Sequence, residues 1–197
     1  MRKFVCWILV AMTLTAVASG ARAQRTDQAR RRRAELVYAE CADVTSTSLP
    51  SPPQVDEVVE EQVARVAADA AVRRLLPIVL RSLGLTSEAS EFEGAAPTHD
   101  EASLASLGDA ALRLASRIGA AAPASLSVAN ARRVQRAARL AWGATYPLRR
   151  SRAAPSTAVL ALYRDLFVMA HRIDPAASCR VAADVVAGAD AVIRRAQ

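Results

Sequence analysis

The segment THDEASLASLGDAALRLASRI, residues 98–118, has the clearest helical pattern in the chain. Its apolar residues recur at intervals of three, four, three and four positions, at Leu104, Leu107, Ala111, Leu114 and Ile118. That spacing places them on one face of an α-helix, and such a face must be buried against other helices. Thr98 and Glu101 fit a capping box, so we predict that Thr98 is the N-cap of this helix.

Similar patterns predict five other helices, over residues 24–41, 54–83, 125–142, 155–173 and 175–197. We expect Gly84 and Gly143 to end the helices before them, and Pro77 to kink or break the helix that contains it. Asp174 and Pro175 are suited to the N-cap and first position of the last helix. In the 54–83 helix we predict a buried stripe of valines at Val55, Val58, Val59, Val63 and Val66.

The rest of the sequence also has the composition of an all-α protein. Residues 86–97 contain Glu88, Glu91 and Glu93 and are predicted to be an acidic loop. No segment alternates as a strand and no repeat is present, while alanine, leucine and arginine, all good helix formers, are abundant. We therefore predict an irregular antiparallel bundle of five or six helices.

The first 23 residues are laid out like a secretory signal peptide. Two basic residues precede an apolar run over residues 4–17, and Ala-Arg-Ala at 21–23 fits a cleavage site. A run of about fourteen residues is shorter than the roughly twenty that span a bilayer. We predict cleavage before Gln24 and a secreted or periplasmic protein; an uncleaved anchor is the alternative.

After this leader the sequence divides into two further parts. Residues 24–53 contain the first predicted helix and a linker rich in proline, serine and threonine. Residues 54–197 form the predicted helical bundle domain. Cys41 and Cys179 are the two cysteines left after cleavage, and in an exported protein we expect them to form a disulfide. Two unpaired buried thiols are the alternative.

Charge is segregated along the chain. Residues 54–109 hold eleven acidic residues and four arginines, whereas residues 110–152 hold nine arginines and no acidic residue. One interpretation is that the two segments pack side by side and neutralise each other. The other is an exposed basic face that binds an acidic partner, formed by Arg132, Arg136, Arg139, Trp142, Tyr146, Arg149, Arg150 and Arg152.

The second interpretation predicts a non-catalytic binding protein. Its partner would be an acidic protein, a polyanionic glycan or an anionic membrane surface; nucleic acid suits an exported protein less well. Trp142 has a second interpretation, as a side chain that closes the core at a helix end. The chain contains no GxSxG, P-loop, GxGxxG, HExxH or CxxCH motif, so we predict no enzyme, no metal site and no cofactor.

The alternative function is a bundle that carries a small apolar ligand or haem. Tyr163, Phe167 and His171 recur at four-residue intervals along one predicted helix and would line such a space.

Mass spectrometry of the protein exported by its own host tests the leader and the disulfide together. We expect a chain that starts at Gln24, lacks the two hydrogens lost on disulfide formation, and resists thiol alkylation before reduction. A chain that still starts at Met1 would instead be anchored. Alkylation of the native protein at Cys41 or Cys179 would contradict the disulfide.

Overall fold

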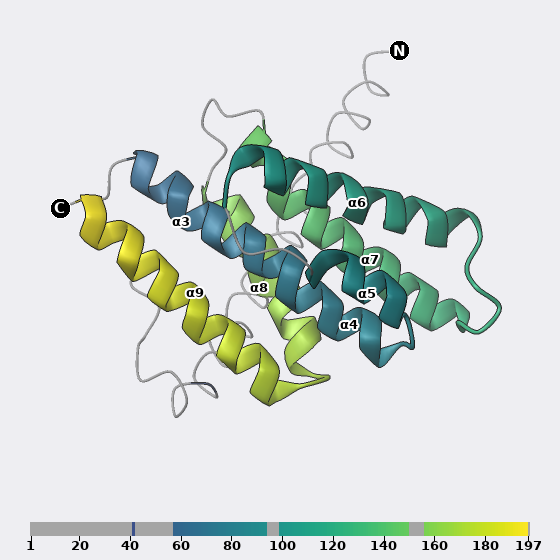
Figure 1. The fold of residues 1–197 in the computed structure, drawn as a ribbon. Helices are drawn as coiled ribbons and strands as arrows, with labels where there is room; N and C mark the ends of the chain where they lie inside the picture. The colour runs from purple at the N-terminus through teal and green to yellow at the C-terminus, as the bar shows by residue number, and fades with distance from the viewer. Residues whose placement is uncertain (1–40, 42–56, 94–98, 150–155, 197) are drawn as a thin grey trace, which may run out of the picture.

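The computed structural model describes Cys41 and residues 57–93, 99–149 and 156–196. Within these ranges the regular structure is entirely helical, and the predicted all-α antiparallel bundle is confirmed. Figure 1 shows α9 beside α3, with α8 behind them and α6 paired with α7. The predicted leader, first helix (apart from Cys41) and linker lie outside the described residues.

A long central rod runs through the bundle. It consists of α3 (Glu57–Ala70), a π-helical turn, η1 (Ala71–Leu75), and α4 (Leu76–Ser82). Pro77 has no N–H to donate, and its ring crowds the carbonyl four residues earlier. The wider turn precedes it, with the Leu76 N–H donating to the Ala71 carbonyl. The predicted disturbance at Pro77 therefore takes the form of a π turn within a continuous rod.

Gly84 ends this rod, as predicted. Its φ of 78° is left-handed, where a side chain would be strained. The N–H groups of Gly84 and Leu85 donate to the carbonyls of Arg81 and Leu80, which closes the helix end in a Schellman arrangement.

The predicted acidic loop over residues 86–97 is wrong for its first part, because Thr86–Glu93 forms helix α5. Leu85, Ala89 and Phe92 are spaced four and three residues apart and are all buried. This short apolar face outweighs the three glutamates, of which Glu91 and Glu93 are exposed and Glu88 is half-buried. Residues 94–97 lie outside the described part of the chain.

Helix α6 (Glu101–Ala120) has the predicted apolar face, but its N-cap is Asp100 and not Thr98. The Asp100 Oδ1 accepts a hydrogen bond of 2.8 Å from the Ser103 N–H. A carboxylate both caps the free N–H groups and complements the positive end of the helix dipole, so it competes well with a nearby threonine. Leu104, Ala111, Leu114 and Ile118 are buried, and Leu107 is half-buried.

Helix α7 (Val128–Thr145) starts at the N-cap Ser127 and continues past Gly143, so the predicted end at Gly143 is wrong. A Cβ at position 143 would lie 3.1 Å from Leu162 Cδ1 of the neighbouring helix. The glycine therefore allows close packing of two helices and does not terminate one. A short 3-10 turn, η2 (Pro147–Arg149), follows.

The last two helices, α8 (Ser156–His171) and α9 (Pro175–Ala196), form a tight hairpin. Asp174 caps α9 as predicted, since its Oδ1 accepts from the Ala177 N–H at 2.8 Å. Helix α9 packs closely on α3, because a Cβ at Gly188 would lie only 2.9 Å from Val66 Cγ1. The predicted Cys41–Cys179 disulfide is present and ties Cys41 to the start of α9.

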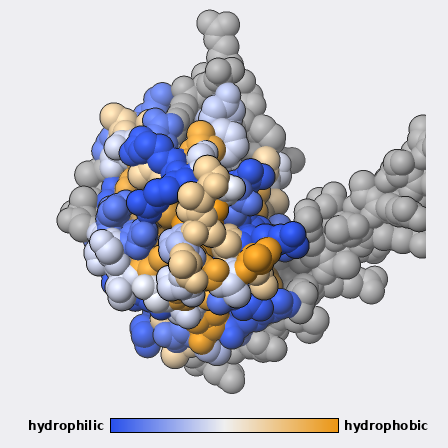
Figure 2. All heavy atoms as spheres, turned by 90° about the vertical axis from the view of Figure 1, so that its right-hand side faces the viewer, coloured by the Kyte–Doolittle hydropathy of each residue, from blue (hydrophilic) through white to orange (hydrophobic). Residues whose placement is uncertain are grey.

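The surface of the described residues has only isolated large apolar side chains. Val58, predicted to be buried, is 58% exposed, because it lies about 100° around the helix from Val59, whose side chain faces the core. Three further large apolar side chains in the described residues are exposed, those of Leu112, Val128 and Ile173. Figure 2 shows the side that lies on the right of Figure 1, where hydrophilic side chains surround separate apolar groups. Val55 lies outside the described residues.

Two identical substitutions on α6 test the predicted apolar face. Leu104 is 1% exposed, so we expect Leu104→Ala to lower the free energy of unfolding by about 2–5 kcal/mol through lost burial and a cavity. Leu112 is 37% exposed, and Leu112→Ala should cost less than about 1 kcal/mol. Urea unfolding followed by circular dichroism measures both. Equal losses in the free energy of unfolding for the two variants would contradict the orientation of α6.

Candidate functional site

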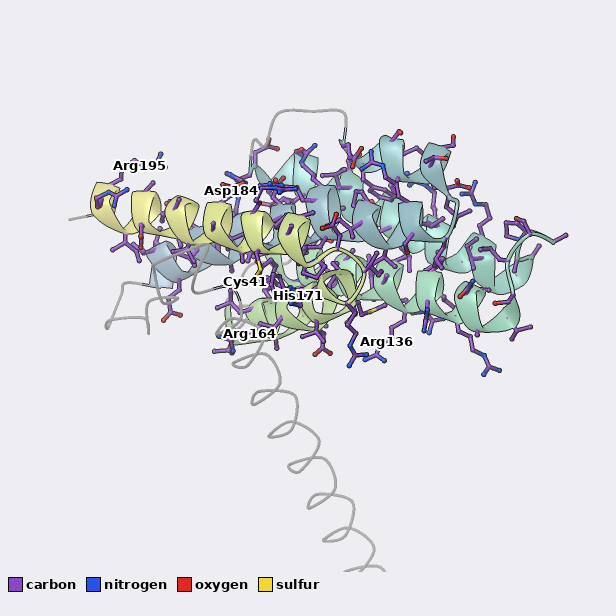
Figure 3. All side chains as sticks on the ribbon, turned by 90° about the horizontal axis from the view of Figure 1, so that it is seen from below. Cys41, Arg136, Arg164, His171, Asp184 and Arg195 are labelled. Carbon is purple, nitrogen blue, oxygen red and sulfur yellow. A yellow bond between two sulfur atoms is a disulfide. The ribbon has the colours of Figure 1, made fainter. Side chains whose placement is uncertain are left out.

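Helix α7 presents three arginines to solvent on one face. Arg132, Arg136 and Arg139 are all exposed. At 100° per residue they fall within an arc of about 60° and extend about 10 Å along the helix axis. The opposite face, with Val134, Ala137, Ala138 and Ala141, is buried in the core. The core thus fixes the direction of the arginine face, and Figure 3 shows Arg136 projecting outward.

Ion pairs distinguish these arginines from those of the acid-rich segment. All four arginines between residues 54 and 109 have an acidic partner: Arg65–Glu61, Arg73–Asp69, Arg74–Asp184 and Arg81–Glu93. Arg117 of α6 pairs with Glu88 at 3.2 Å and joins the basic segment to the acidic one. Among the described residues, no acidic side chain forms an ion pair with Arg132, Arg136 or Arg139. The two segments therefore neutralise each other only in part.

A shallow hollow lies between the α7 arginines. Its volume is about 270 Å³, and it is lined by Arg132, Gln135, Arg136, Arg139 and Leu140. Gln135 donates to the Ala115 carbonyl of α6 at 3.3 Å, which fixes one wall of the hollow. We call Arg132, Arg136, Arg139 and this hollow the α7 face. Its guanidinium groups offer planar, paired donors to carboxylate, sulfate or phosphate oxygens.

The other residues predicted for the basic face are placed differently. Trp142 and Tyr146 are half-buried, and their ring centroids lie 5.0 Å apart. Trp142 also packs against the core, which agrees with its second interpretation. Arg149 lies in η2, but the structure does not describe its side chain, and Arg150 and Arg152 lie outside the described residues. Of the eight predicted residues, the α7 face therefore contains Arg132, Arg136 and Arg139.

The residues predicted to line a ligand space form a row of neighbouring rings along α8. The ring centroids of Tyr163 and Phe167 lie 6.3 Å apart, and those of Phe167 and His171 lie 5.6 Å apart. Tyr163 and Phe167 are fully buried, whereas His171 is half-buried. They do not line the hollows described in this section.

Sequence reasoning missed a buried ion pair in a groove between α3 and α9. Asp69 and Arg73 are both buried and joined by a 2.7 Å hydrogen bond from Arg73 Nε to Asp69 Oδ1. Arg73 Nη2 also donates to Ser103 Oγ at 2.7 Å, which links the central rod to α6. The four-residue spacing of opposite charges within an apolar run was the available signal.

Two adjoining hollows form this groove, with volumes of about 490 and 430 Å³. His99 and Val66 line both of them. His99 Nδ1 lies 3.8 Å from Asp69 Oδ2, and Arg74 pairs with Asp184 across the space between the two helices. The charges of the groove are largely satisfied within the protein, so it offers an outside ligand less free charge than the α7 face.

No helix in the described ranges has the length and apolarity needed to cross a membrane.

The buried pair can be compared with an exposed one of the same spacing. Asp69→Asn leaves the Arg73 charge buried without its carboxylate, so we expect a loss of roughly 3 kcal/mol in the free energy of unfolding. Glu61→Gln breaks the partly exposed Arg65–Glu61 pair and should cost less than about 1 kcal/mol. Thermal or urea unfolding measures both. A loss for Asp69→Asn no larger than that for Glu61→Gln would contradict a structural role for the pair.

Comparison with protein-family models, with curated proteins and with solved structures finds no match to this chain.

Proposed function

We propose that this protein is a secreted or periplasmic, non-catalytic binding protein that holds an acidic macromolecule on its α7 face. One observation carries the proposal: Arg132, Arg136 and Arg139 are exposed and make no ion pair among the described residues, whereas every arginine of the acid-rich segment has an acidic partner. Cations held in one direction on a helix, with no ion pair among the described residues, are suited to an external anion.

The geometry of the face favours a partner with several anionic groups. Three guanidinium groups spread over about 10 Å can contact successive carboxylates or sulfates of one chain at the same time. A single small anion would contact only part of this row. An acidic protein segment and a sulfated glycan both have the necessary repeated charge, and an anionic membrane surface has it in two dimensions.

The chemistry of the hollow supports binding and not catalysis. Its lining consists of guanidinium, amide and aliphatic groups from Arg132, Gln135, Arg136, Arg139 and Leu140. Such a set has neither a nucleophile nor a general base that works near neutral pH. The isolated exposed apolar residues give no comparable surface, so we expect electrostatic attraction to dominate and binding to weaken with salt.

Retention on immobilised heparin and on immobilised polyglutamate tests the proposal. We expect wild-type protein to be retained at low salt and eluted by sodium chloride. The triple variant Arg132→Ala, Arg136→Ala, Arg139→Ala should elute at lower salt, with its affinity reduced by about tenfold or more, because each lost surface ion contact costs up to about 1 kcal/mol.

The matched control removes the same charge elsewhere. Arg180, Arg194 and Arg195 are exposed on α9, and their replacement by alanine lowers the net charge equally. This control should keep most of the wild-type affinity. Equal losses of affinity in the two triple variants would mean that net charge alone, and not the α7 face, determines binding. Binding that changes neither with salt nor with the α7 substitutions would contradict the proposal.

A further inference from the structure

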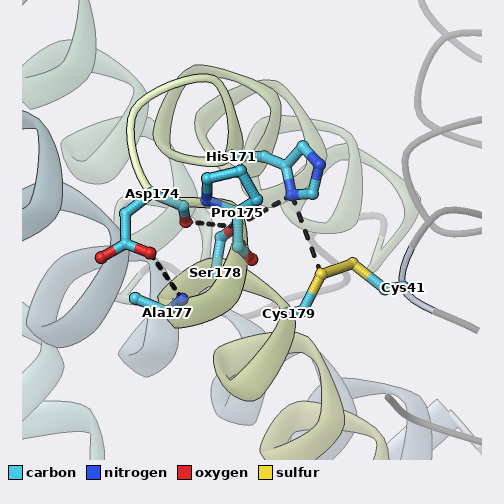
Figure 4. The surroundings of a disulfide bond; sticks show 7 residues. All are labelled: Cys41, His171, Asp174, Pro175, Ala177, Ser178 and Cys179. Carbon is cyan, nitrogen blue, oxygen red and sulfur yellow. Dashed lines mark hydrogen bonds between the residues drawn. A yellow bond between two sulfur atoms is a disulfide. The ribbon is translucent and has the colours of Figure 1, made fainter. Parts of the chain in front are cut away.

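The disulfide has a histidine beside it. The imidazole of His171, at the end of α8, lies with its Nδ1 3.8 Å from Cys179 Sγ near the start of α9. One ligand atom each from Cys41, His171 and Cys179 lies within 4.8 Å of the other two. Figure 4 shows the imidazole and the two sulfurs facing one another. Spacing in the sequence does not predict this cluster, because Cys41 is 138 residues away from Cys179.

The α8–α9 turn fixes two of the three side chains. Only three residues separate the helices, and the Asp174 cap holds the first turn of α9 in place. The imidazole stacks on the buried ring of Phe167 at an angle of 23° and lies 3.0 Å from Ser178 Oγ. His171 and Cys179 are therefore held by contacts other than the disulfide, and Cys41 is the one member that comes from outside the hairpin.

The surroundings of the cluster suit a soft or borderline metal ion. Cys41 and Cys179 are 1% and 4% exposed, whereas His171 is half-buried. Two thiolates and one imidazole form a ligand set that favours zinc over magnesium or calcium, which prefer oxygen ligands.

We propose that, when the disulfide is reduced, Cys41, Cys179 and His171 bind one zinc ion through two thiolates and the imidazole Nδ1. Tetrahedral zinc with Zn–S of about 2.3 Å and Zn–N of about 2.0 Å requires S···N separations of about 3.5 Å and an S···S separation of about 3.8 Å. The separation of 3.8 Å between Nδ1 and Cys179 Sγ is close to the first of these values, and the three ligand atoms lie within 4.8 Å of one another. Reduction frees the two sulfurs to meet the second, and water completes the tetrahedron.

The protons and electrons of this step balance. A reductant breaks the Cys41–Cys179 bond by supplying two electrons. A dithiol also supplies the two thiol protons and becomes a disulfide, whereas a phosphine takes oxygen from a water molecule, whose two protons go to Cys41 and Cys179. Zinc then displaces the two thiol protons. The Ser178 hydroxyl donates to the carbonyl of Asp174 or Pro175, at 2.9 or 3.0 Å, so its oxygen accepts from the His171 Nδ1–H. Zinc binding moves that hydrogen to Nε2 without net proton release.

The experiment uses the chain as its host exports it, reduced with a phosphine and titrated with cobalt(II) and then zinc. We expect the visible absorption of tetrahedral cobalt, a thiolate-to-cobalt charge-transfer band, displacement of cobalt by one equivalent of zinc, and release of about two protons per metal ion. The oxidised protein should show none of these signals. The site is independent of the α7 face, so heparin binding by the oxidised protein is tested separately.

Two histidine variants make the test specific. His171→Ala removes a ligand and should weaken zinc binding by roughly tenfold or more, since even loss of an outer-shell partner costs that much. His99→Ala changes the only other histidine of the chain and should bind like wild type. Equal zinc affinities for His171→Ala and wild type would overturn the proposal.

Reduction can loosen the bundle, so circular dichroism should be recorded with and without zinc. Zinc is expected to preserve or restore the helical signal of the reduced wild type. Reduced wild type that binds zinc no more tightly than a Cys41→Ser, Cys179→Ser variant, whether folded or not, contradicts the site.

Discussion

The central rod of the bundle has to pass through a residue that cannot donate a backbone hydrogen bond. Pro77 would leave an ordinary α-helix with a missing bond and a steric clash, and the π turn at Ala71–Leu75 absorbs both. The rod stays continuous and contacts every helix from α5 to α9. Because a π turn shifts the helical register, buried side chains lie on more than one side of the rod, which suits a helix in the middle of a bundle.

Small residues at crossings determine how closely the other helices pack. Gly188 of α9 lies against Val66, and Gly143 of α7 lies against Leu162. Alanine and valine supply much of the core, so each helix buries modest apolar area. A disulfide that spans 138 residues then gives a sizeable contribution, on the order of 4–5 kcal/mol in the chain-entropy model. The redox state of this bond affects stability as well as the proposed metal site.

The charged residues fall into two groups with different consequences. Acidic residues between 54 and 109 hold nearby arginines in place, and the buried Asp69–Arg73 pair links the rod to α6 through Ser103. The arginines of α7 face solvent on a helix whose other side belongs to the core. The α7 face and the His171–disulfide cluster share no residue, so each proposal is tested by its own substitutions.

Within the described residues, the sequence by itself determined the helical segments other than α5, the Gly84 and Asp174 helix ends and the cysteine pairing, because these follow from local spacing, capping chemistry and cysteine count. It failed at residues 86–93, at Thr98 and at Gly143, where a buried face, a competing cap or a neighbouring helix outweighed the local signal. Only the tertiary structure decided which arginines pair with acidic residues far away in the chain, since Arg74 and Asp184 are 110 residues apart. It also decided that His171 lies beside the disulfide, because chain folding and not spacing brings those side chains together.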